Sequence, residues 1–136
     1  MAYSKLLLKF NKYFIKDVSG LILTFYKSSK EDIKKCCEIG DYIMASQLKN
    51  ANWNHGLSGA CRGGHMEIVE LMIFRGVTDW NWGLWGACCG GHMEIVKLMI
   101  SKGATDWEWG FSGAYSGGHM EIQKYLEELI KTKNDS

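Results

Sequence analysis

The chain has no proline, almost no excess of charge and no long apolar run. Its 136 residues include 16 Lys or Arg and 15 Asp or Glu, which gives a formal net charge of +1. Because so small a net charge produces no overall field of one sign, we expect no nucleic-acid partner. The apolar stretches span only a few residues each, so we expect neither a transmembrane helix nor a signal peptide.

The chain also lacks the even, spaced set of cysteines that is typical of secreted disulfide-rich domains. Its five cysteines form two adjacent pairs and a single residue: Cys36, Cys37, Cys61, Cys88 and Cys89. This usage fits a reducing compartment, so we expect an intracellular, cytoplasmic protein. Adjacent cysteines lack the two-residue spacer of zinc-binding pairs, and we expect no metal site.

What the chain does have is an internal repeat, which emerges when the sequence is compared with itself. The motif Gly-Gly-His-Met-Glu-Ile begins at Gly63, Gly90 and Gly117, each copy 27 residues after the last. With 46% hydrophobic residues, the chain can fold as one domain. The expected units are an N-terminal helical cap, a degenerate repeat and three full repeats, in the ranges 1–28, 29–52, 53–79, 80–106 and 107–133.

Each full repeat predicts a helix, a glycine turn and a second helix. In the middle copy, Asp79 can cap the first helix, and Gly90 and Gly91 can end it with a positive φ. The second helix is expected over about 92–102, with Gly103 at its C-terminal end. One such pair cannot bury its apolar side alone, so the copies are expected to stack on one another as a solenoid.

The repeat resembles a known family. Residues 87–104 read Ala-Cys-Cys-Gly-Gly-His-Met-Glu-Ile-Val-Lys-Leu-Met-Ile-Ser-Lys-Gly-Ala, which is similar to the ankyrin-repeat pattern A-A-x-x-G-H-x-x-I-V-x-L-L-L-x-x-G-A. The resemblance covers residues 53–133 and is weak over 30–52. It implies a module that binds other proteins. The Trp-rich copies also faintly resemble the short repeat arrays of large DNA viruses.

Two departures from the family pattern shape the expected fold. Residues 82–85, Trp-Gly-Leu-Trp, replace the family's Thr-Pro-Leu-His segment and contain no proline. The repeat is also about six residues shorter than the 33-residue family repeat, which leaves no room for a β-hairpin. We therefore expect an all-α, ankyrin-like helix-turn-helix solenoid.

Positions that differ between copies of one scaffold indicate a surface that can change without harming the fold. In the first helices these positions fall on one helical stripe, which we expect to face solvent or a partner. We call this set the variable stripe: Asn54, His55, Ser58, Arg62, Asn81, Trp82, Trp85, Cys89, Glu108, Trp109, Ser112 and Ser116. Invariant glycines such as Gly86 form a second stripe, where a neighbouring backbone can approach closely. Trp80, Leu84 and Cys88 are apolar in every copy and are expected in the core.

Trp82, Trp85 and Trp109 are the expected anchors of the variable stripe, because Trp is enriched among binding hot spots. For Trp82 and Trp109 the alternative is that they fill the space left by the absent hairpin. Trp85 has serine in both other copies. We therefore expect Trp85→Ser to weaken binding at least about tenfold and to leave the melting temperature nearly unchanged.

No set of residues indicates catalysis or a bound cofactor, so we do not expect an enzyme. The repeated histidines His65, His92 and His119 lie one repeat apart, which is about 8–10 Å for packed helices. That separation is too large for one metal ion with nitrogen bonds of about 2 Å. The family resemblance instead implies a structural hydrogen bond for this histidine.

The two ends of the chain depart from the repeat. Residues 1–30 contain six lysines and one acidic residue, and we expect an amphipathic helix that covers the stack. The alternatives are a helix on a membrane surface and a docking helix for a partner. Four of the lysines share one face of the predicted helix: Lys5, Lys9, Lys12 and Lys16. In the last copy, Gln123 and Glu127 replace apolar residues, which gives the polar outer face of a terminal repeat.

The sequence thus favours a protein–protein interaction module that binds a partner protein through the variable stripe. The alternative is a structural protein that self-associates into a homo-oligomer through the tryptophans of that stripe. An F-box-type adaptor is disfavoured, because the Leu-Pro opening of that motif is absent. We do not expect the chain to enter a membrane.

Overall fold

The computed structural model describes residues 31–47 and 51–136 and is helical throughout these ranges, without a strand. This confirms the all-α prediction for the described residues; the expected cap at 1–28 lies outside them. The helices α2 to α9 are, in chain order, Glu31–Ile39, Tyr42–Gln47, Trp53–Gly63, Met66–Phe74, Trp80–Gly90, Met93–Lys102, Trp107–Gly117 and Met120–Asn134.

The helices begin and end at the residues that the sequence indicates. The Oδ1 atom of Asp79 accepts a hydrogen bond from the Trp82 backbone N–H at 3.4 Å, which caps α6. The end of α6 is Gly91, whose φ of 79° is favourable for glycine alone, while Gly90 remains helical. Gly103, with φ of 117°, ends α7 in the same way. The predicted pattern of helix, glycine turn and helix is confirmed in all three full copies.

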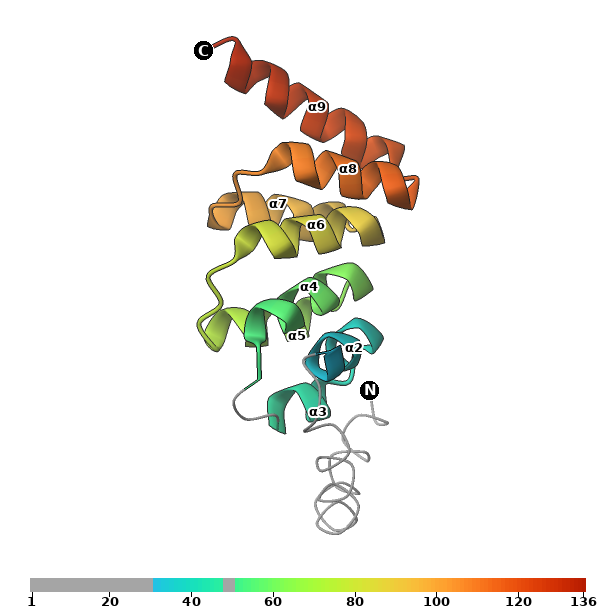
Figure 1. Ribbon diagram of the computed structural model, residues 1–136, viewed down its shortest axis with the longest axis vertical. Helices are drawn as coiled ribbons and strands as arrows, with labels where there is room; N and C mark the ends of the chain where they lie inside the picture. Colours follow the sequence, from blue (N-terminus) through green and yellow to red (C-terminus); the bar gives the residue numbers. More distant parts are fainter. Residues whose placement is uncertain (1–30, 48–50) are drawn as a thin grey trace.

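The helix pairs follow one another along the long axis of the molecule, from α2 and α3 at one end to α9 at the other (Figure 1). The first helices of successive pairs, α2, α4, α6 and α8, pack directly on one another. Glycine makes this packing close: a Cβ atom at Gly86 of α6 would overlap the carbonyl oxygen of Ser58 in α4. The stripe of small residues therefore lies at the contact between repeats.

The core is built from the same register in each repeat. Leu57 and Leu84 are fully buried, and each points toward the first helix of the next pair. Met72 and Met99 of the second helices fill the space beneath Gly56 and beneath the equivalent glycine of α6. Buried apolar side chains thus form one continuous core along the stack.

The prediction that one stripe is core in every copy is wrong at the last repeat. Cys61 and Cys88 are buried, but Tyr115 at the same register is 73% exposed. Among the described residues α8 packs against α6 and α9, and no further first helix packs on it. Trp80 is also only half-buried, although α6 packs between α4 and α8, so the core prediction is too strong for this residue as well.

The last helix, α9, is longer than the second helices of the earlier copies. Gly76 and Gly103 end those helices with a positive φ, and Ile130 stands at the same register in α9. Glu127 is exposed and pairs with Lys131 at 3.3 Å, whereas Gln123 is half-buried. In the described part of the chain, no helix is long and apolar enough to cross a membrane.

Candidate partner-binding surface

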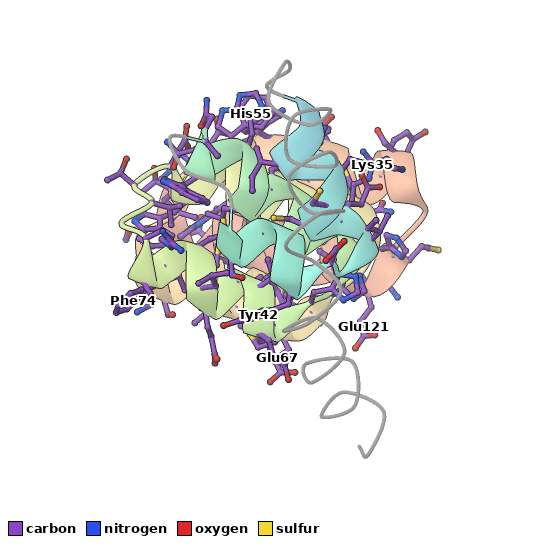
Figure 2. All side chains as sticks on the ribbon, turned by 90° about the horizontal axis from the view of Figure 1, so that it is seen from below. Lys35, Tyr42, His55, Glu67, Phe74 and Glu121 are labelled. Carbon is purple, nitrogen blue, oxygen red and sulfur yellow. The ribbon has the colours of Figure 1, made fainter. Side chains whose placement is uncertain are left out.

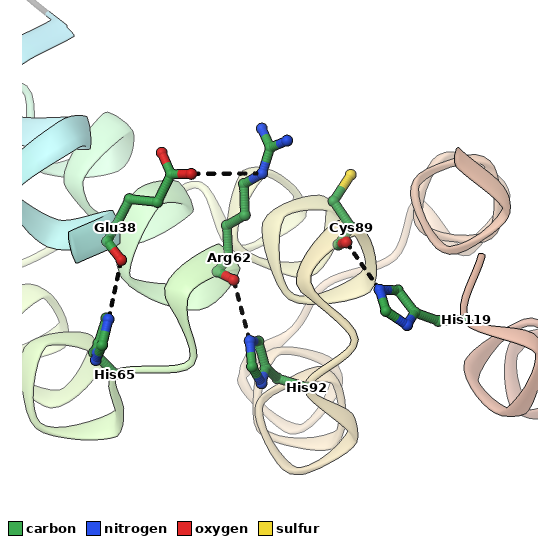
Figure 3. Close-up of polar contacts among 6 residues, drawn as sticks. All are labelled: Glu38, Arg62, His65, Cys89, His92 and His119. Atoms are coloured by element: carbon green, nitrogen blue, oxygen red, sulfur yellow. Dashed lines mark hydrogen bonds and ion pairs between the residues drawn. The ribbon is translucent and has the colours of Figure 1, made fainter. Parts of the chain in front are cut away.

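The repeated histidines join each repeat to the one before it (Figure 3). Each ring lies at the start of a second helix and reaches the C-terminal end of the preceding repeat's first helix. A carbonyl oxygen can only accept, so Nε2 is the protonated nitrogen. The Nε2–H groups of His65, His92 and His119 donate to the carbonyl oxygens of Glu38, Arg62 and Cys89 at 3.0, 3.1 and 3.1 Å. Among the described residues, no three His, Cys, Asp or Glu side chains gather in a way that could hold a metal ion.

Two residues of the variable stripe, Asn54 and Asn81, hold the loops between repeats. The Oδ1 atom of each accepts two backbone N–H groups from the loop that precedes the next first helix. For Asn81 the donors are Thr105 and Asp106, at 2.9 and 3.0 Å. Glu108 stands at this register in the last copy, and in the described residues no loop to a further first helix follows it. The acceptor atoms of Asn54 and Asn81 are therefore used inside the stack, and a contact of these two residues with a partner stays a prediction.

The structure also corrects the placement of Ser58. Its side chain is 1% exposed, because α6 packs over it at Gly86. Trp85 has the same register in the next repeat, and a Cβ atom at Gly113 would lie 3.1 Å from its Cδ1 atom. Ser58 cannot contact a partner, and half-buried Trp85 contributes to the packing of α6 against α8.

Four rings of the variable stripe form one continuous group, which we call the aromatic cluster: His55, Trp82, Trp85 and Trp109. His55 stacks on Trp82 with ring centroids 5.9 Å apart, and Trp85 stacks on Trp109 at 5.6 Å. Trp82 joins the two pairs by edge-to-face contacts, at 6.1 Å to Trp85 and 5.0 Å to Trp109. Trp82 is 39% exposed, and the other three rings are half-buried. Figure 2 shows His55 at the edge opposite Glu67, so the cluster begins on the side formed by the first helices.

The remaining residues of the variable stripe lie around this cluster without joining it. Arg62 is exposed and pairs with Glu38, with 3.9 Å between Nε and Oε1. Ser112 and Ser116 are exposed, and the Ser116 hydroxyl donates to the Ser112 carbonyl oxygen at 3.0 Å. Glu108 is exposed beside Trp109 in the chain. The accessible part of the predicted surface is thus the aromatic cluster with the polar residues at its margin.

The cysteines differ sharply in their surroundings. Burial raises the pKa of the Cys61 thiol, and it raises the pKa of Cys88 to about 12, with the neighbouring Cys89 adding to the effect. Partial burial also raises the pKa of Cys89, although the positive charges of Arg62 and Lys34 act in the opposite direction. Cys89 is half-buried, whereas the other four cysteines are at most 1% exposed.

We therefore expect a thiol reagent to label Cys89 of the folded protein before any other cysteine. Reaction requires both a thiolate and access to it, and the buried thiols have neither. Mass spectrometry of peptides after brief labelling measures the order, and labelling in concentrated urea provides the control in which all five react at similar rates. Equal native labelling of Cys61 and Cys89 would contradict the described burial.

The two aspartates that cap α6 and α8 bind the backbone of two cluster tryptophans. Asp79 and Asp106 accept hydrogen bonds from the backbone N–H groups of Trp82 and Trp109. Each cap therefore places a carboxylate in the first turn of a helix that carries a ring of the cluster. Neither a family model, nor a curated protein, nor a solved structure matches this chain.

Proposed function

We propose that the chain is an ankyrin-type repeat protein that binds a partner protein through the aromatic cluster. The observation that carries this proposal is the continuity of the cluster: its rings come from three successive repeats and contact one another. Trp presents a large, rigid apolar surface and is enriched at the centres of protein interfaces. A partly exposed group of such rings is suited to a protein partner.

The ankyrin-type assignment is supported by contacts between repeats that stabilise the stack in the absence of a hairpin. His92 links its helix pair to the preceding one by a hydrogen bond, and Asn81 links the same pair to the following one by holding the loop between them. Close packing at Gly86 completes the contact. Because these residues stabilise the stack, the aromatic cluster is left as the part of the variable stripe available for binding.

The test is Trp82→His, which introduces the residue found at the same register in the preceding copy, His55. We expect proteins captured by the full chain to be lost from this variant, and the affinity for a purified partner to fall at least about tenfold, or about 1.4 kcal/mol. Capture is read by mass spectrometry and the affinity by calorimetry.

The matched control is Phe74→Ser. Phe74 is 86% exposed and has serine at its register in the next copy, Ser101. Figure 2 shows it on a different side of the molecule from His55. Phe74→Ser should leave capture intact; if both variants capture as well as the natural sequence does, the aromatic cluster is not the binding surface.

The second proposal is self-association through the same rings, favoured by the exposure of Trp82. Sedimentation equilibrium over a range of concentrations distinguishes it. If the natural sequence is a dimer and Trp82→His is a monomer, the cluster binds a second copy of this chain. If the natural sequence is a monomer at every concentration, self-association is excluded.

A further inference from the structure

The chain covers several of its own aromatic rings with cations. The Arg75 guanidinium lies 5.0 Å from the centroid of the Trp53 ring, and the Lys133 ammonium lies 5.2 Å from that of Trp107. A third pair joins Lys97 to Tyr125 at 5.6 Å. Such contacts are favourable because the face of an aromatic ring carries partial negative charge.

The aromatic cluster differs from these rings because no cation of the described residues lies over Trp82, Trp85 or Trp109. Its own side chains pack ring against ring instead. The cluster therefore presents tryptophan surface that the described part of the chain leaves without a positively charged partner.

Three carboxylates belong to the first turns of the helices that carry Trp82 and Trp109, and none of them forms an ion pair with a described residue. Asp79 and Asp106 are fixed in place, because each binds the backbone N–H of a cluster tryptophan. Their backbone N–H groups are in turn held by asparagine side chains. Glu108 adds an exposed carboxylate next to Trp109. Each aspartate carries a full negative charge, which exceeds the positive charge of about one half at the helix N-terminus that it caps, and Glu108 adds a further negative charge.

We propose that the aromatic cluster binds an arginine-rich segment of its partner protein, an inference that rests on the proposed function. A guanidinium is planar, stacks on aromatic faces and forms paired hydrogen bonds with carboxylates. Both kinds of group, the rings of Trp82 and Trp109 and the three carboxylates, belong to the N-terminal turns of α6 and α8. The nearest cation of the variable stripe, Arg62, lies at the C-terminal end of its helix and is already paired with Glu38.

The test is a calorimetric titration of the full chain with a nona-arginine peptide, with nona-glutamate as the comparison. We expect nona-arginine alone to bind, with an affinity that decreases as salt is added. Trp82→His should weaken this binding about tenfold. Glu108→Asn, which introduces the residue of the two earlier copies, should weaken it about threefold and leave the unfolding midpoint unchanged.

The matched control is Glu128→Ser, which removes an exposed carboxylate from α9 and introduces the residue at this register in the middle copy, Ser101. Its affinity for nona-arginine should equal that of the natural sequence. An equal loss in Glu128→Ser and Glu108→Asn would show that only net charge matters and would overturn the proposal.

One further outcome would also overturn it. Absence of nona-arginine binding, with partner capture still lost in Trp82→His, would reject the arginine-rich ligand and leave the proposed function standing.

Discussion

Gly86→Ala should destabilise the protein by about 1 to 3 kcal/mol, the usual cost of overpacking. In an exposed helix the same change is favourable by about 1 kcal/mol, because alanine is the better helix former. Here the new methyl group would overlap the carbonyl oxygen of Ser58, which belongs to a helix backbone and cannot turn aside. The shift of the midpoint of urea unfolding measures the effect, and its sign alone distinguishes the two cases.

Two controls make the result specific. A Cβ atom at Gly113 would lie 3.1 Å from the Trp85 carbonyl oxygen, a tight but not overlapping contact, so Gly113→Ala should cost less than Gly86→Ala. Ser112→Ala lies on the exposed part of the variable stripe and should change stability by about 0.5 kcal/mol at most. Similar midpoints for all three variants would show that α4 and α6 do not pack as closely as described.

Trp85→Ser should reduce both binding and stability, which differs from the expectation drawn from the sequence. The Trp85 ring stacks on Trp109 with centroids 5.6 Å apart and lies against Gly113. Its removal should lower the free energy of unfolding by about 1 to 2 kcal/mol, since an aromatic pair contributes beyond its buried area. Affinity for a purified partner should fall at least about tenfold, because the ring that supports Trp109 is lost.

The comparison with Trp82→His separates the two effects. Trp82 is the most exposed ring of the cluster, so its replacement should reduce affinity with a smaller loss of stability. Thermal unfolding gives the melting temperature of each variant, and calorimetric titration gives its affinity for the partner. An unchanged melting temperature for Trp85→Ser would show that Trp85 is a surface residue, as the sequence indicated.

The sequence by itself determined the features that depend on a few neighbouring residues. Asp79 marks the start of α6 and Gly103 marks the end of α7, because capping and positive φ act within one turn. The period of 27 residues excluded a hairpin, and the described residues contain none. The invariance of Gly86 indicated a close backbone contact, which the structure shows.

Only the tertiary structure decided what each variable position does. Asn81 and Ser58 are used inside the stack because the next repeat places a loop or a helix against them. Tyr115 is exposed because, among the described residues, no further first helix packs on α8. A difference between copies therefore did not by itself indicate a free surface, because it also occurs where the next repeat packs, as at Ser58. The contact with the next repeat separates the two cases, and it forms only when the helices stack.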